Sequence, residues 1–189
     1  ARSPLDEQAT LQVEILLRQE RLCETLGLRA RQQHLIDRLI TLLESSGERA
    51  HLGEVYLRQG DLFTLLRSFE RAEPALEKSL QIRRTLRDTA GERHTLRSLG
   101  LMQWHQGRYD DALRTIDTAL KLDRQHHDVS GVVGELVGRG AVLKSKGDLA
   151  QARVALEEAL DLSQRELAGD EELPGGLKLP YILHGLANV

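Results

Sequence analysis

The segment GRYDDALRTIDTALKL, residues 107–122, carries the pattern from which the fold is deduced. After Ala112, apolar or small residues recur at Ile116, Ala119, Leu120 and Leu122. The first three follow Ala112 by 4, 7 and 8 residues, a spacing that places them on one face of an α-helix. Gly107 is the first residue of the segment, where glycine suits the end of a preceding helix. The segment therefore predicts a turn followed by a helix with one buried stripe.

The same pattern occurs three times without gaps. Its copies begin at Phe69, Tyr109 and Leu149, which are 40 residues apart. The matching positions are Leu76, Ile116 and Leu156, then Ser79, Ala119 and Ala159, then Leu80, Leu120 and Leu160, then Ile82, Leu122 and Leu162. Ahead of each copy stands a further match at Gly60, Gly100 and Gly140. A period of this length predicts stacked helix pairs, because one pair cannot bury its own apolar face.

We expect residues 1–189 to form a single helical-repeat domain that is a fragment of a longer protein. Its parts are a divergent first helix pair (9–44), repeats at 47–87, 91–126 and 131–167, a loop (168–180), and the first helix of a truncated repeat (181–189).

The register between Gly60 and Phe69 stays open. Gly60 can match the later helix glycines, or Gly60-Asp61-Leu62 can be a turn, which makes the next turn spacing 107 − 60 = 47. Proline deep inside a helix costs roughly 3 kcal/mol. Pro74 therefore predicts a break or kink between Arg67 and Glu73.

Composition narrows the function. The chain has 37 leucines against 15 valines and isoleucines, which favours helices over strands. The net charge of −3 shows no basic excess, so we expect no nucleic-acid partner. No apolar run approaches the roughly 20 residues of a membrane span, and Cys23 is alone, which indicates a cytoplasmic setting. No catalytic, metal-binding or cofactor-binding motif is found, and the protein is not predicted to be an enzyme.

The repeats resemble the tetratricopeptide repeat family. The matching features are the small residues Gly100 and Gly140, the turn Gly107-Arg108-Tyr109, and the alanines Ala112 and Ala119. The 40-residue spacing is similar to the long repeats of kinesin light chains and of bacterial signalling proteins. The resemblance implies an all-α α-solenoid of stacked antiparallel helix pairs forming a right-handed superhelix. It also implies a scaffold or regulatory domain that binds a protein or peptide in its concave groove.

In this family the first helix of each pair lines the groove. The resemblance therefore gives the following candidate groove residues: Glu54, Leu57, Arg58, His94, Arg97, Leu101, Trp104, His105, Val137, Ala141 and Lys144. Together they predict an apolar strip with basic flanks, suited to a peptide with apolar and some acidic residues. Trp104 can be either a binding anchor in this groove or a core residue between helices.

Two alternatives remain. The repeats can serve self-association, with a homodimer formed through the open C-terminal end around Ile182, Leu183 and Leu186. They can also be the accessory repeat region of a larger enzyme or transcriptional regulator.

Overall fold

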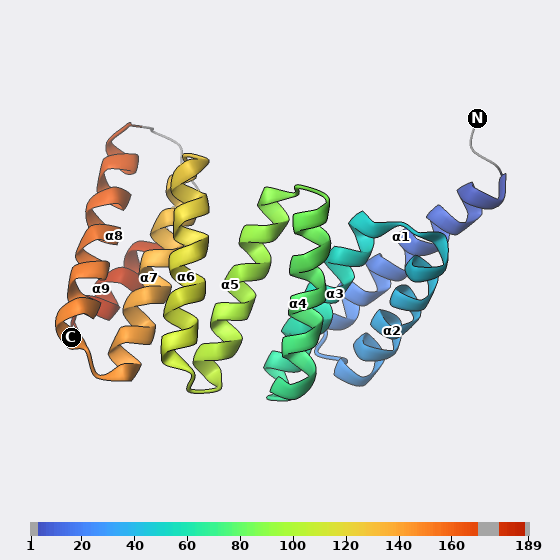
Figure 1. Cartoon of the computed structure of the whole chain (residues 1–189), viewed down its shortest axis with the longest axis horizontal. Helices are drawn as coiled ribbons and strands as arrows, with labels where there is room; N and C mark the ends of the chain where they lie inside the picture. Colours follow the sequence, from blue (N-terminus) through green and yellow to red (C-terminus); the bar gives the residue numbers. More distant parts are fainter. Residues whose placement is uncertain (1–3, 170–177, 188–189) are drawn as a thin grey trace. The chain divides into compact units, whose positions relative to one another are not determined.

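A computed structural model describes residues 4–169 and 178–187, and within these ranges every regular element is an α-helix. The helices are α1 (Pro4–Thr25), α2 (Arg29–Ser46), α3 (Arg49–Leu65), α4 (Phe69–Thr85), α5 (Thr89–His105), α6 (Tyr109–Gln125), α7 (Val129–Lys146), α8 (Leu149–Gly169) and α9 (Lys178–Ala187). Within each unit, helices joined by a described turn run in opposite directions (Figure 1). The predicted all-α fold of stacked helix pairs is confirmed.

The helices begin at regular intervals along the sequence. From Arg29 to Leu149, each helix begins 20 residues after the one before it. One residue in each turn has a left-handed backbone: Gly27, Gly47, Arg67, Arg87, Gly107, His127 and Gly147. The next amide usually bonds back five residues, as from Arg108 to the Gln103 carbonyl at 2.9 Å, which closes the last turn of the helix. Two helices and two such turns account for the 40-residue period.

The chain divides into two compact units, Ala1–Thr95 and Leu96–Val189, with the division inside α5. In unit 1, α1 packs on α2, α2 on α3, and α3 on α4. In unit 2, α6 packs on α7, α7 on α8, and α9 on both α7 and α8. Each unit has its own aliphatic core, with Ile36 and Leu39 fully buried in unit 1 and Leu136 buried in unit 2.

Glycines at matching positions allow the two helices of a repeat to approach closely. A Cβ added at Gly60 would lie 2.5 Å from Leu76, and one added at Gly140 would lie 2.8 Å from Leu156. The same relation holds more loosely for Gly100 and Ile116, at 3.3 Å. In each case the glycine on the first helix faces a side chain 16 residues later on the second helix.

This relation decides the register that the sequence left open. Gly60 is buried inside α3, so the alternative with a turn at Gly60 is wrong. The turn instead occupies residues 66–68, directly before α4. Pro74 lies within α4, near its start. The break between α3 and α4 at residues 66–68 overlaps the predicted interval from Arg67 to Glu73.

The C-terminal boundaries also differ from the prediction. The expected loop at 168–180 is helical at both ends, because α8 reaches Gly169 and α9 already begins at Lys178. The middle of that expected loop lies outside the described residues. Ile182 is fully buried in the unit 2 core, so it is not part of an exposed end, whereas Leu183 is 49 % exposed. None of the helices in the described ranges has the length and apolarity that a bilayer crossing requires.

Candidate functional site

Three of the predicted groove residues lie on α3 in unit 1, and they form part of an ion-pair network. Leu57 is 3 % exposed, so it belongs to the core rather than to an open surface. Arg58 donates to the Glu20 carboxylate at 2.8 Å and to Glu54 at 3.1 Å. Glu54 also accepts from Arg83 at 2.8 Å. In unit 1, the apolar strip expected from the sequence is therefore wrong at these positions.

Glu20, on α1, is the buried anchor of this network. Its side chain is fully buried and accepts hydrogen bonds from Gln32 at 2.7 Å and from Arg58 at 2.8 Å. Burial disfavours the charged Arg58 guanidinium, but the charges of Glu20 and Glu54 outweigh it and raise the Arg58 pKa. Sequence reasoning missed Glu20, although a charged residue among buried positions such as Val13 was a usable signal.

The network continues to the start of α5. The Asp88 carboxylate accepts a hydrogen bond from the Gly91 amide at 2.9 Å and pairs with Arg83 through its other oxygen. The Gly91 amide lowers the Asp88 pKa; partial burial opposes this, and Arg83 adds to the lowering. His94, one turn further along α5, is exposed.

Arg97, at the start of the α5 segment in unit 2, neutralises buried acids. Its Nε donates to Glu135 on α7 at 2.7 Å, and its Nη2 lies 3.9 Å from an Asp123 oxygen. The Glu135 and Asp123 side chains are only 2 % and 1 % exposed, whereas Arg97 is 47 % exposed. Removing one partner of such a pair leaves a buried charge uncompensated. Arg97 therefore has a structural role whether or not it also contacts a ligand.

Trp104 combines the two interpretations that the sequence left open. It is half-buried and packs against the apolar cluster of Ala112, Ile116 and Val142. Its indole N–H donates to the Ser145 hydroxyl on α7 at 2.9 Å. The ring also stacks on exposed His105, with centroids 5.3 Å apart and planes inclined by 15°. Trp104 thus ties α5 to α7 and keeps an aromatic surface beside His105.

The remaining predicted residues of unit 2 lie on α5, with Trp104, and on α7, with Ser145. Leu101, one helical turn before Trp104, is 44 % exposed. On α7, Val137 and Ala141 are half-buried and Lys144 is exposed. Ala141 lies one helical turn before Ser145, the residue that Trp104 contacts, and Lys144 directly precedes Ser145. We call this set the unit-2 face: Leu101, Trp104, His105, Val137, Ala141 and Lys144.

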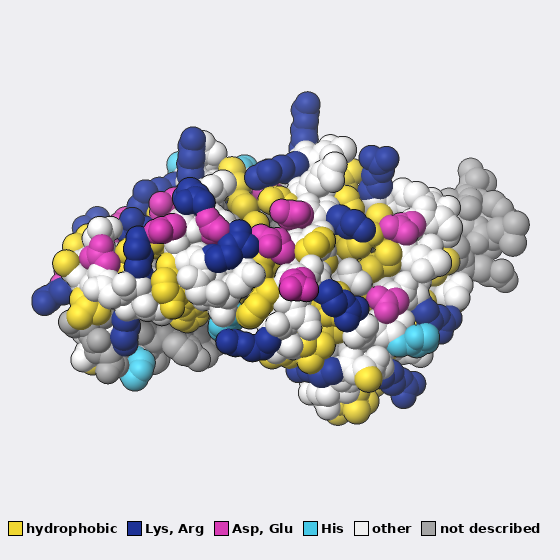
Figure 2. Space-filling model, turned by 60° about the horizontal axis from the view of Figure 1, so that its bottom comes forward, with side chains coloured by type: hydrophobic (Ala, Val, Ile, Leu, Met, Phe, Trp, Pro, Cys, Tyr) yellow, Lys and Arg dark blue, Asp and Glu magenta, His cyan; other side chains and the backbone are white. Residues whose placement is uncertain are grey.

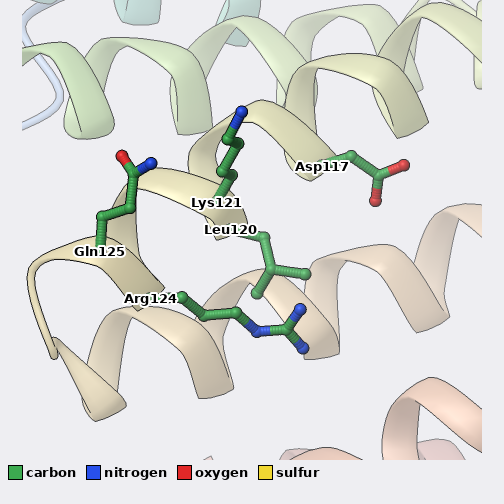
Figure 3. Close-up of a pocket in the computed structure, with 5 residues that line it drawn as sticks. All are labelled: Asp117, Leu120, Lys121, Arg124 and Gln125. Carbon is green, nitrogen blue, oxygen red and sulfur yellow. The ribbon is translucent and has the colours of Figure 1, made fainter.

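Outside the unit-2 face, the surface has two hollows of about 450 Å³ each. The first lies along α6 and is lined by Asp117, Leu120, Lys121, Arg124 and Gln125, whose side chains project from that one helix (Figure 3). Asp117 pairs with Arg139 at 3.2 Å, and Arg124 pairs with Glu158 at 2.6 Å. The second lies between α1 and α2 and includes Leu16, His34 and Asp37.

The surface chemistry is mixed. Acidic and basic side chains are interspersed with apolar ones over the face shown in Figure 2. Within the described residues, no three His, Cys, Asp or Glu side chains gather in a way that could hold a metal ion. Cys23 is a buried free thiol.

Comparison with known proteins gives matches to family models and to solved structures. Two models described as tetratricopeptide repeat match residues 48–125 and 136–166, which together exceed half of the chain. A similar solved structure is that of BtubC (BKLC) from P. vanneervenii, with a TM-score of 0.78 and 20 % sequence identity. The alignment covers 88 % of this chain and 68 % of that chain, and at this identity it shows the fold alone. The comparison with curated proteins found no significant match.

Proposed function

The chain belongs to the tetratricopeptide repeat family, and on that premise we propose that its unit-2 face binds an acidic, partly apolar segment of a partner protein. Repeats of this family generally mediate protein–protein interaction and generally serve as non-catalytic scaffolds. The proposal assigns the module to a cytoplasmic scaffold or regulatory protein.

The observation that carries the proposal is the exposed apolar and aromatic surface around Trp104. Leu101 exposes 44 % of its surface to solvent beside the stacked Trp104 and His105 rings. Aromatic residues with one apolar face and a satisfied polar atom are frequent anchors in protein interfaces. The Trp104 N–H is already bonded to Ser145, so a ligand need not provide an acceptor for it.

Charge supports an acidic ligand. Lys144 and His105 are exposed at the edge of the unit-2 face, and none of its six residues is acidic. The nearby Glu135 carboxylate is buried and bonded to Arg97. An acidic segment therefore meets the positive charge of Lys144 without an exposed carboxylate among these residues. The unit 1 positions fit such a ligand less well, because Glu54 and Arg58 are bonded within the network.

The test is a selection from a random peptide library, followed by binding measurements with individual peptides. Trp104 is the only tryptophan, so its fluorescence reports directly on the proposed face. We expect the selected peptides to be rich in acidic and apolar residues and to shift the emission of Trp104. The disrupting variant is Leu101→Ser with Lys144→Glu, because both side chains are exposed and their replacement leaves the core intact.

A matched control makes the same chemical changes on the second helices. Val154→Ser with Lys121→Glu alters an apolar side chain on α8, 62 % exposed, and an exposed lysine on α6. Binding that is lost in the disrupting variant and kept in the control supports the proposal. Binding that is equal in both variants, or lost only in the control, refutes it. Arg97 is left unchanged, because an acid there would face two buried carboxylates.

A further inference from the structure

Helix α1 carries an exposed apolar stripe on the side away from the core. The stripe consists of Leu11, Ile15, Leu22 and, just after the helix, Leu26, which are 57 %, 47 %, 58 % and 61 % exposed. Their spacing of 4, 7 and 4 residues keeps them on one helical face. The buried residues of α1, among them Val13, Leu16 and Leu17, lie on another face. We call the four exposed residues the α1 stripe.

The stripe gathers four exposed apolar side chains on one helical face, whereas the other exposed leucines occur singly or in adjacent pairs such as Leu65 and Leu66. Contiguous apolar patches on a monomer often mark an interaction site, whereas scattered ones are ordinary. Beside the stripe lies a hollow of about 350 Å³, lined by residues that include Leu11, Ile15, Gln19 and Arg38. This hollow gives a partner's side chains a place to insert.

Along one side, or flank, of the stripe, the charged residues change sign from its first half to its second half. Glu14 stands near its first half, and Arg18 and Arg21 stand near its second half, all three exposed. Among the side chains that the structure describes, these three form no ion pair with one another or with a neighbour. In a parallel pair, this flank would face the opposite flank of the other copy, so the three charges would not meet one another. Two antiparallel copies bring each Glu14 to the Arg18 and Arg21 of the other, which is favourable.

We propose that the α1 stripe is the interface of a homodimer in which two copies of α1 pack antiparallel about a two-fold axis. In this arrangement Leu11 of one chain lies opposite Leu22 of the other, and Ile15 lies near the axis. A two-fold interface must be self-complementary, and the apolar stripe with its opposed charges meets that condition. The α1 stripe belongs to unit 1 and includes no residue of the unit-2 face. The two proposals can therefore be tested independently.

The first test is the molar mass in solution, measured by light scattering over a range of concentrations. The native chain is expected to approach twice its mass of 21.2 kDa as concentration rises. Ile15→Glu with Leu22→Glu places charges on exposed positions and is expected to give a monomer with unchanged helical circular dichroism. Leu183→Glu with Val154→Glu, which changes exposed apolar positions in unit 2, is the matched control and is expected to remain dimeric.

Charge reversal identifies the occupant of the stripe. Glu14→Arg makes the flank wholly basic, and Arg18→Glu with Arg21→Glu makes it wholly acidic, so each variant alone is expected to be monomeric. Mixing the two is expected to restore a dimer containing one chain of each kind. For the orientation, in a Cys23→Ala background, a Leu11→Cys chain is expected to cross-link to a Leu22→Cys chain and not to itself.

Several results would overturn this inference. A native chain that stays monomeric at every concentration excludes the dimer, and leaves the stripe to another protein or a further repeat. A dimer that survives Ile15→Glu with Leu22→Glu lies elsewhere, for example at the C-terminal end. A failure of the oppositely charged variants to pair, or cross-linking of Leu11→Cys to itself, rejects the antiparallel arrangement.

Discussion

Replacing Gly140 by alanine tests whether the repeat glycines are required for close packing of the two helices. An alanine Cβ at this position would lie 2.8 Å from Leu156 Cγ and 2.9 Å from its Cδ2. Leu156 is 3 % exposed, so it has little room to move. Gly138, two residues earlier on α7, is the control, because its added Cβ would meet only Ile116, at 3.9 Å.

The two substitutions share one favourable effect and differ in one unfavourable effect. Alanine is better than glycine in a helix interior by up to about 1 kcal/mol. Only Gly140→Ala also overpacks the core, which typically costs about 1–3 kcal/mol. We therefore expect Gly138→Ala to raise the free energy of unfolding by up to about 1 kcal/mol. Gly140→Ala should fall below Gly138→Ala by about 1–3 kcal/mol, the overpacking contribution alone.

The assay is urea unfolding followed by circular dichroism, with the free energy of unfolding compared among the variants. The double variant Gly140→Ala with Leu156→Ala, compared with Leu156→Ala alone, removes the clash while keeping the helix effect. In that background Gly140→Ala should no longer destabilise. Equal stability of Gly140→Ala and Gly138→Ala in the native background would refute the role assigned to the repeat glycines.

Four further predictions address the buried charge, the turns and the pH dependence. Arg58→Ala should destabilise unit 1 by about 3–5 kcal/mol because it removes the charge partner of the buried Glu20 carboxylate; a urea-unfolding cycle with Glu20→Ala should show strong non-additivity. His127→Gly should raise the free energy of unfolding by up to about 1 kcal/mol, because its left-handed backbone suits glycine, and the thermal midpoint measures this. The lowered pKa of Asp88 gives stability that is complete above its ordinary value near 3.9 and is lost as pH falls through the folded pKa, so Asp88→Asn should flatten the acid limb of unfolding. Tyr56 has a pKa raised to about 12 by burial and by its bond to a carboxylate, so stability should fall as pH rises above 10, and Tyr56→Phe should reduce that slope in an alkaline titration.

The repeat could be predicted from the sequence because it rests on local geometry. The 40-residue match of Gly60, Gly100 and Gly140 corresponds to close helix contacts in the structure. The ambiguity at Gly60 arose because glycine serves both in turns and at close helix contacts, and pattern alone does not separate these uses. The turn at residues 66–68 uses Arg67 in the left-handed position instead of glycine, so it carried no strong signal.

The site was less predictable because it depends on contacts between distant residues. Helical stepping gave the correct helices, but it did not show that Leu57 is buried or that Arg58 reaches Glu20. Trp104 illustrates the limit. Its position on α5 follows from the repeat, whereas its bond to Ser145 depends on how α7 packs on α5.

The sequence separation between contacting residues affects how the chain can fold during its synthesis. The bond from Arg58 to Glu20 and that from Arg97 to Glu135 each span 38 residues, and the bond from Trp104 to Ser145 spans 41. Each of these distances is about one helix pair. Because closing a shorter loop costs less entropy than closing a longer one, contacts between neighbouring helix pairs form at a lower entropic cost than contacts between distant parts of the chain would. A nascent chain leaving the ribosome can thus form the bond between Arg58 and Glu20 once α3 has emerged, long before α7 is synthesised.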